Sequence, residues 1–110
     1  MSRFLFSVIV PVYNTEQYII ETLESVIHQT IGFMEHIQLI LVNNATQDNS
    51  ASICKFYRSM YPDNVIYVQL PENKGPNGAR AEGLTYASGE YVNFLDSDDK
   101  WSIQAFERAA

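Results

Sequence analysis

The sequence is poor in cysteine, in basic side chains and in long apolar stretches. Cys54 is its only cysteine, so an internal disulfide is excluded, and its apolar neighbours favour a buried thiol. Seven basic residues against thirteen acidic ones give a net charge of -6, which argues against nucleic acid or an anionic membrane as the main partner. No stretch reaches the roughly 20 apolar residues that a membrane-spanning helix needs. These absences predict a cytoplasmic protein with no nucleic-acid partner.

What the sequence does contain suits one packed domain. Its 110 residues are long enough for a single unit over 1–110, and its 46% of hydrophobic residues can fill a core. A phosphate ligand would be repelled by the acidic chain unless a cation bridged it to carboxylates. The composition is therefore compatible with a metal-dependent anion site.

Four apolar segments rich in β-branched residues predict buried strands, at residues 6–12, 37–42, 65–68 and 91–95. The first segment is almost unbroken, so it should be central in a sheet. Between the strands, apolar residues recur at helical spacing. They predict a helix over 19–27, a second helix with Ile53, Phe56, Tyr57 and Met60 on one face, and a third that runs through Ala87.

Polar residues mark the ends of these elements. Asn14 is expected to cap the first helix, with Gln17 as its capping-box partner. Residues 71–78 hold two glycines and two prolines, which predicts a loop. Because strands and helices alternate, right-handed crossovers are expected, and the fold class is α/β with a mostly parallel sheet and helices on both faces.

In such sheets ligands bind beyond the carboxyl ends of the strands. Three polar patches follow predicted strands and should meet at that edge: 13–14, 43–44 and 96–99. In the last patch Asp96 and Asp98 flank Ser97, and crowded carboxylates of this kind favour Mg²⁺ or Mn²⁺. The alternative is a solvated turn, for which Asp and Ser are equally suited.

Four blocks of the sequence, in order, resemble the signatures of family 2 glycosyltransferases of the GT-A fold. They are VIVPVYN at 8–14 with LESVIHQT at 23–30, LVNNATQDNS at 41–50, NKGPNGAR at 73–80 with Gly83-Leu84, and ASGEYVNFLDSDD at 87–99. The resemblance covers nearly the whole chain. It implies the Rossmann-like, nucleotide-binding half of the GT-A fold and an enzyme that transfers a sugar from a nucleotide sugar, such as a UDP-sugar, to a hydroxyl acceptor, with inversion.

The resemblance also implies roles for residues at the predicted edge. Pro11, Tyr13 and Asn44 would line the nucleoside pocket, and Arg80 would lie near the base or the diphosphate. Tyr13 is equally suited to covering a strand end, because aromatic faces serve both purposes.

The predicted cofactor, Mn²⁺ or Mg²⁺, falls at the acidic patch. By resemblance, Asp96 would face the ribose or the metal, and Asp98 would ligate the metal.

Two departures from the family pattern occur at the second block. The family usually has two acids where this chain has Asn43 and Asn44, and glycine where Ala45 stands. The asparagines either meet the base, where a turning amide would discriminate less strictly than a carboxylate, or shape the loop after the second strand.

In this family the general base and the acceptor pocket lie beyond the metal motif. The sequence ends soon after it, so we expect a truncated, donor-binding part that transfers no sugar alone. The saccharide or glycosylated acceptor would bind the missing part.

Two other functions remain open. A signalling receiver also alternates strands and helices around an acidic site with a lysine nearby, here Lys100, but it needs acids where Tyr13 and Asn14 stand. A non-catalytic module that forms a homo-oligomer through exposed apolar surface is the other alternative.

Overall fold

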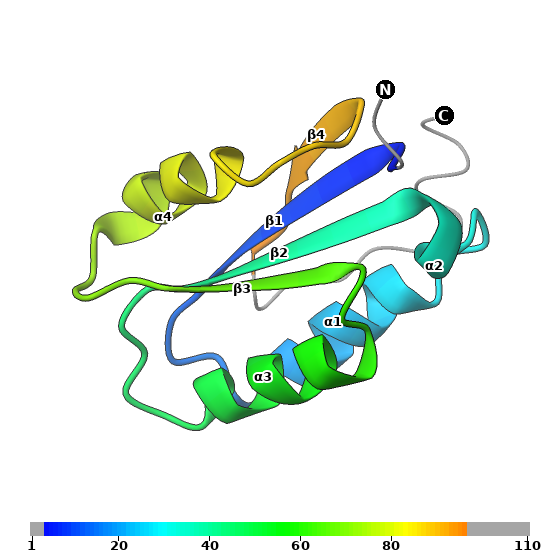
Figure 1. Cartoon of the computed structure of the whole chain (residues 1–110). Helices are drawn as coiled ribbons and strands as arrows, with labels where there is room; N and C mark the ends of the chain where they lie inside the picture. The colour runs from blue at the N-terminus through cyan, green and yellow to red at the C-terminus, as the bar shows by residue number, and fades with distance from the viewer. Residues whose placement is uncertain (1–3, 97–110) are drawn as a thin grey trace.

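A computed structural model describes residues 4–96, which form a parallel sheet with helices on both faces (Figure 1). The elements follow one another as β1 (Phe6–Val12), α1 (Ile19–Ile27), α2 (Phe33–His36), β2 (Ile37–Asn43), α3 (Ser50–Met60), β3 (Val65–Gln69), α4 (Gly75–Leu84) and β4 (Tyr91–Phe94). The predicted α/β class is confirmed.

The sheet has the strand order β3-β2-β1-β4, and each pair of neighbours is parallel. β1 lies between β2 and β4, so the central position predicted from its apolar run is confirmed. Every residue of β2 is buried, as is every residue of β1 except Pro11. Such strands need cover on both faces, which explains their continuous apolar sequence.

Helices α1 and α3 cover one face of the sheet, and α4 covers the other (Figure 1). The first core packs α1 residues such as Leu23 and the α3 residues Cys54 and Tyr57 against β1 and β2. Cys54 is fully buried, as predicted. None of the described helices is both long and apolar enough to cross a bilayer.

On the second face of the sheet, α4 and the segment after it lie very close to β1. A Cβ on Gly83 of α4 would lie 2.5 Å from a methyl carbon of Ile9 in β1, and one on Gly89 would lie 2.6 Å from the backbone nitrogen of Ser7. The Gly89 N–H donates to the Ser7 hydroxyl at 2.7 Å, and that hydroxyl donates to Gln38 at 2.6 Å. The segment between α4 and β4 is therefore tied directly to β1 and β2.

The main differences from the sequence predictions concern the cap of α1 and the bounds of α4. The capping box is wrong: Tyr18 stands at the N-cap of α1 without a side-chain bond, and the Asn14 side chain contacts the loop after β2 instead. α4 begins at Gly75, inside the predicted loop, because Pro76 suits a first helical turn and lacks only an N–H that has no partner there. It ends at Leu84, with hydrogen-bonded turns as far as Ala87.

The short helix α2 was not predicted. Gly32 precedes it with φ of 101°, and the Asn64 side-chain amide donates to the backbone oxygens of Phe33, Met34 and Ile37. A side chain distant in sequence therefore stabilises this turn, and local periodicity carries no signal for it.

Two residues other than glycine have positive φ: Asn14 at 50° and Ala45 at 61°. Asparagine tolerates the left-handed region because its short side chain bonds locally, but for alanine the Cβ crowds the following carbonyl. Ala45 stands where the family pattern has glycine, so this departure has a measurable backbone cost.

We predict that Ala45→Gly stabilises the chain. Removing the Cβ relieves about 1–2 kcal/mol of left-handed strain, and the added freedom of glycine in the unfolded chain costs about 0.5–1 kcal/mol, leaving a gain of about 0.5–1 kcal/mol. Urea denaturation measures the difference. The matched control is Ala81→Gly on the exposed face of α4, where the same change should cost about 1 kcal/mol. A loss of stability in Ala45→Gly would contradict the strain.

Candidate functional site

A cavity of about 300 Å³ opens at the carboxyl ends of the strands. It lies at the edge where the loops after β1, β2 and β3 gather, on the left in Figure 1. Its walls come from all four strand ends: Pro11, Tyr13, Thr15, Asn44, Asn73, Pro76 and Asp96. The structure thus brings together four residues singled out from the sequence, Pro11, Tyr13, Asn44 and Asp96, as the parallel topology requires.

The apolar wall of the cavity is formed by β1. Pro11 is half-buried at the end of the strand, and Tyr13 follows it with 40% of its surface exposed. Tyr13 therefore presents a large aromatic surface to the cavity. A flat aromatic surface beside a proline can hold a planar ring by stacking and burial.

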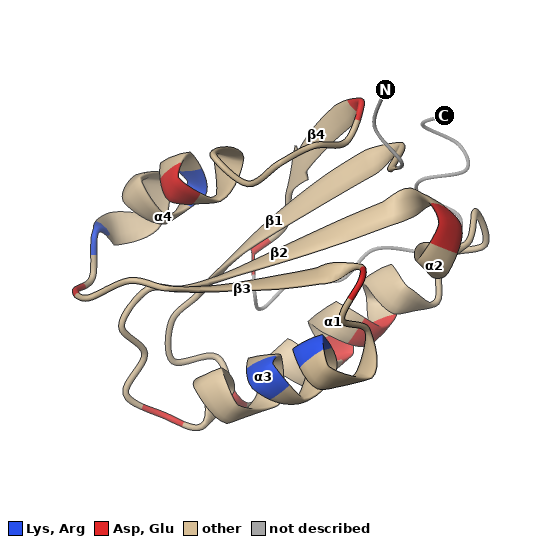
Figure 2. Cartoon of the chain, in the orientation of Figure 1, with Lys and Arg blue, Asp and Glu red and all other residues tan. Residues whose placement is uncertain are grey.

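Arg80 and Asp96 form an ion pair at the edge of the cavity. The Arg80 Nη2 atom lies 2.9 Å from the Asp96 Oδ1 atom, and Nη1 donates to Asn77 at 3.2 Å. The side chains are 30% and 54% exposed, so the pair is worth about 0–1 kcal/mol and can exchange partners. Arg80 lies within α4. The other lysine and arginine residues in the described part of the chain lie on α3 or at the start of α4 (Figure 2).

Asp96 is the only one of the two predicted metal ligands that the structure describes; Asp98 lies outside residues 4–96. Within those residues no three His, Cys, Asp or Glu side chains gather into a set that could hold a metal ion. The Asp96 carboxylate, half exposed at the end of β4, suits one oxygen ligand of a hard cation. The described residues therefore fit part of a metal site.

Asn44 lines the cavity, but its amide is held by backbone groups. The side-chain oxygen accepts from the Lys74 N–H at 2.8 Å, and the side-chain nitrogen donates to the Gly75 oxygen at 3.1 Å. Turning the amide would oppose donor to donor and acceptor to acceptor, so its orientation is fixed. Asn44 is 3% exposed and joins the loop after β2 to the start of α4.

Asn43 does not line the cavity. It is 1% exposed, its amide nitrogen donates to the Tyr67 hydroxyl at 2.8 Å, and its oxygen accepts from the Thr46 N–H at 2.8 Å. Asn43 thus ties β2 to β3 and closes the turn that follows. Of the two roles considered for the asparagine pair, this contact set favours shaping of the loop.

The loops after β1 and β2 are joined by Asp48. Partial burial of the Asp48 carboxyl opposes its ionisation, but hydrogen bonds from Ser50, Thr46 and Glu16 outweigh this and lower its pKa to about 2. Burial, with the nearby Asp48 charge, raises the pKa of the Cys54 thiol to about 12, so Cys54 stays protonated and serves as core.

Sequence reasoning missed Thr15, Asn73 and Pro76 as wall residues. A usable signal was present for Asn73 and Pro76, because they follow β3 and the loops after parallel strands share one edge. The same signal was present for Thr15, which follows β1. Its hydroxyl is buried and has no partner among the described residues, so it is a free polar group in the wall.

Comparisons with known proteins agree with this geometry. The family model described as Glycosyl transferase family 2 matches residues 7–110. The chain is 53% identical over 102 residues to the minor teichoic acid biosynthesis protein GgaB of Bacillus subtilis (strain 168), which covers 93% of this chain and 11% of that protein.

Two solved structures extend the likeness. S. aureus TarS 1–349 in complex with UDP superposes with a TM-score of 0.86 at 37% identity, over 94% of this chain and 30% of that one. The mannosyltransferase PcManGT from Pyrobaculum calidifontis, in complex with GDP-Man and Mn²⁺, gives a TM-score of 0.80 at 28% identity, over 92% and 29%. The chain therefore spans less than a third of the length of these proteins. It belongs to glycosyltransferase family 2, and its fold is the N-terminal portion of the GT-A fold.

Proposed function

We propose that this chain is the nucleotide-sugar-binding part of a glycosyltransferase that transfers a sugar from a UDP-sugar to a hydroxyl group of a saccharide or glycosylated acceptor. The observation that carries the proposal is the cavity, whose lining includes the aromatic ring of Tyr13, just after β1, and the Asp96 carboxylate, which is paired with Arg80. TarS, 37% identical to this chain, has been solved with UDP and with UDP-GlcNAc. The cytoplasmic location expected from the composition belongs to the same proposal.

The uridine would lie against Pro11 and Tyr13. Both residues line the cavity, and the exposed face of Tyr13 offers a surface on which a base can stack. The Asn44 oxygen already accepts one backbone N–H and has a second lone pair. The amide nitrogen donates one of its two N–H groups to Gly75, so in its fixed orientation Asn44 has one acceptor site and one N–H left for a base.

The diphosphate would lie at the charged edge. Arg80 is a fixed cation there, and its pair with Asp96 is exposed enough to open when phosphate oxygens compete for the guanidinium. We propose that Asp96 and Asp98 hold Mn²⁺ or Mg²⁺. Of these two ions, Mn²⁺ is present in the PcManGT complex. When bound, such a cation neutralises charge on the leaving diphosphate.

In the proposed reaction the bond between the anomeric carbon and the diphosphate oxygen breaks, and its electron pair leaves with UDP. The acceptor oxygen bonds to the opposite face of that carbon, which inverts its configuration. The acceptor proton passes to a general base outside these 110 residues. The described residues bind and orient the donor.

Self-association is the second candidate function. In the sheet formed by residues 4–96, β4 is the last strand on one side, and its Tyr91, Val92 and Phe94 are 56%, 39% and 44% exposed. An apolar edge strand can pair with another copy. Mass measurement in solution separates a monomeric donor-binding domain from a homo-oligomer.

We predict that UDP binding depends on Mn²⁺ and that Asp98→Ala removes the dependence. Without a cation, two phosphates approaching the acidic segment meet like charge at close range. Calorimetric titration of UDP with Mn²⁺ and with chelator gives the two affinities, with the remote charge variant Asp63→Asn as control. Equal affinity in both conditions would refute the metal requirement.

We predict that residues 1–110 alone give no measurable glycosyl transfer, although slow hydrolysis of the donor is compatible with the proposal. Transfer needs an oriented acceptor and a base, and each contributes a large rate factor. Incubation with UDP-sugars and alcohol acceptors, followed by product analysis, tests this. Transfer that Asp98→Ala abolishes would show that these residues hold a complete active site.

We predict that Asn44→Asp weakens UDP binding. A carboxylate keeps the bond from the Lys74 N–H but faces the Gly75 oxygen as acceptor against acceptor, so a bond is lost and about 1–3 kcal/mol of desolvation is uncompensated. Calorimetry with UDP and CDP on both proteins measures it. Tighter UDP binding, with CDP disfavoured, would show instead that the side chain at 44 meets the base directly.

A further inference from the structure

The carboxylate of Asp48 is the meeting point of the two loops that follow β1 and β2. Its Oδ2 atom accepts from the Glu16 N–H at 3.1 Å. Its Oδ1 atom accepts from the Thr46 hydroxyl at 2.7 Å and from the Ser50 N–H at 2.9 Å. One side chain therefore holds its own loop and reaches across to the loop after β1.

The loop after β1 has three consecutive backbone N–H groups that end on this segment. Asn14 donates to the Thr46 hydroxyl at 2.7 Å, Thr15 donates to the Ser50 hydroxyl at 3.3 Å, and Glu16 donates to Asp48. Thr46 and Ser50, the two acceptors besides Asp48, are themselves bonded to Asp48. The three backbone N–H groups of residues 14–16 thus donate either to Asp48 or to a residue that is bonded to Asp48, and the Gln47 N–H adds a further bond to the Asn14 side chain.

This attachment bears directly on the cavity wall. Tyr13 and Thr15 line the cavity and flank Asn14, whereas neither Asp48 nor Glu16 lines it. The bonds donated by the Asn14 and Glu16 N–H groups are exposed, so water competes for them, whereas the bond from Thr15 to Ser50 is partly buried. Without the cross-links, the wall residues would have to be ordered when a ligand binds, at a cost of about 1–2 kcal/mol for each backbone residue.

The hydrogen bonds from Glu16, Thr46 and Ser50 together require a hydrogen-bond acceptor at each of the two side-chain oxygen positions of residue 48. The low pKa of Asp48 is consistent with this, since the ionised carboxylate accepts on both sides. An asparagine amide has one oxygen. If that oxygen stays with Thr46 and Ser50, the amide nitrogen faces the Glu16 N–H, donor against donor. The substitution is therefore selective for one cross-link between the loops, the bond from the Glu16 N–H to residue 48.

We propose that Asp48 is a positioning residue for nucleotide binding: it fixes the loop after β1 so that Tyr13 and Thr15 are ordered before the nucleotide arrives. The choice of a nucleotide as ligand rests on the proposed function. The bond between the loops rests on the observed contacts alone. It assigns to Asp48 no contact with substrate.

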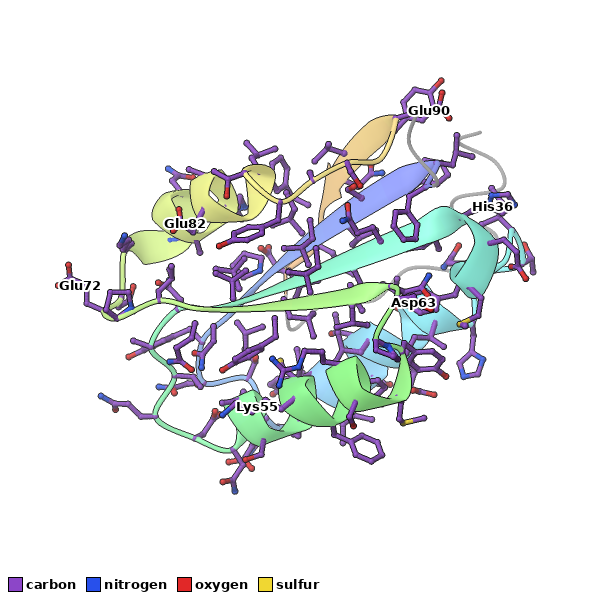
Figure 3. All side chains as sticks on the ribbon, in the orientation of Figure 1. His36, Lys55, Asp63, Glu72, Glu82 and Glu90 are labelled. Atoms are coloured by element: carbon purple, nitrogen blue, oxygen red, sulfur yellow. The ribbon has the colours of Figure 1, made fainter. Side chains whose placement is uncertain are left out.

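Two variants remove the cross-link from opposite sides. Asp48→Asn changes the acceptor, and Glu16→Pro deletes the donor N–H while leaving Asp48 intact; proline suits this position because the turn just before α1 follows. Glu16→Ala keeps the N–H and is the control for the lost side chain. Asp63→Asn controls for the change in charge. Asp63 lies at one end of the sheet and Glu72 at the other (Figure 3).

Calorimetric titration with UDP is expected to show that Asp48→Asn and Glu16→Pro each bind about tenfold more weakly, since a charge-assisted hydrogen bond is worth about 1.5 kcal/mol or more. The double variant should bind no more weakly than either single variant, because both remove the same bond. Both controls should bind as the unchanged chain does. A residue that only stabilised the fold would lower the urea midpoint and leave the affinity of folded molecules unchanged.

Amide hydrogen exchange tests the cross-link without any ligand. In Asp48→Asn the amides of Asn14, Thr15 and Glu16 should exchange at least about tenfold faster, whereas the Leu39 amide, bonded to the Asn64 oxygen in the core, should be unaffected. Unchanged exchange at 14–16, or losses of affinity that multiply in the double variant, would overturn the proposal. If the unchanged chain binds no UDP, the proposed function fails, and the hydrogen-exchange experiment alone tests the bond between the loops. If Asp48→Asn does not fold, Glu16→Pro replaces it as the test variant.

Discussion

The rest of the structure depends on the parallel pairing of β1 with β2, two strands covered on both faces. Their registered partners run from Phe6 with Ile37 to Val12 with Asn43, so both strands end at the same level. Between those ends the two strands are mostly apolar, and the buried polar pair Ser7 and Gln38 is hydrogen-bonded, so the polar groups that line the cavity lie at the edge. The cavity, the ion pair and the cross-linked loops all follow from where these two strands stop.

The edge is held together mainly by neutral side chains bonded to backbone. Asn43, Asn44 and Asn14 each accept from a backbone N–H of another segment or turn. A buried amide satisfies a donor and an acceptor at once and carries no charge to desolvate, whereas a buried carboxylate must find donors for every oxygen. This explains how the chain keeps a family fold with asparagines where acids are usual. The carboxylate it retains in this loop, Asp48, sits where only donors surround it.

The sequence was sufficient for the elements and for the edge where they meet, because continuous apolar strands and helical spacing are local patterns. It failed where partners are distant. Asn14 has the chemistry of a helix cap, yet its oxygen bonds to Gln47, 33 residues away, because the loop after β2 competes for it. α2 depends on Asn64 in the same way. The Thr15 N–H donates to the Ser50 hydroxyl, 35 residues away, so the position of this wall residue also depends on a distant partner.

The two ends of the cavity have different mechanical roles. Around Tyr13 and Thr15 the loops are joined by several mutually supporting bonds, so on the proposal above a base would gain from stacking without first fixing the backbone. Around Arg80 and Asp96 a single exposed ion pair holds the edge, and it costs little to open. The proposed nucleoside diphosphate, with a planar base at one end and a charged diphosphate at the other, would match both halves.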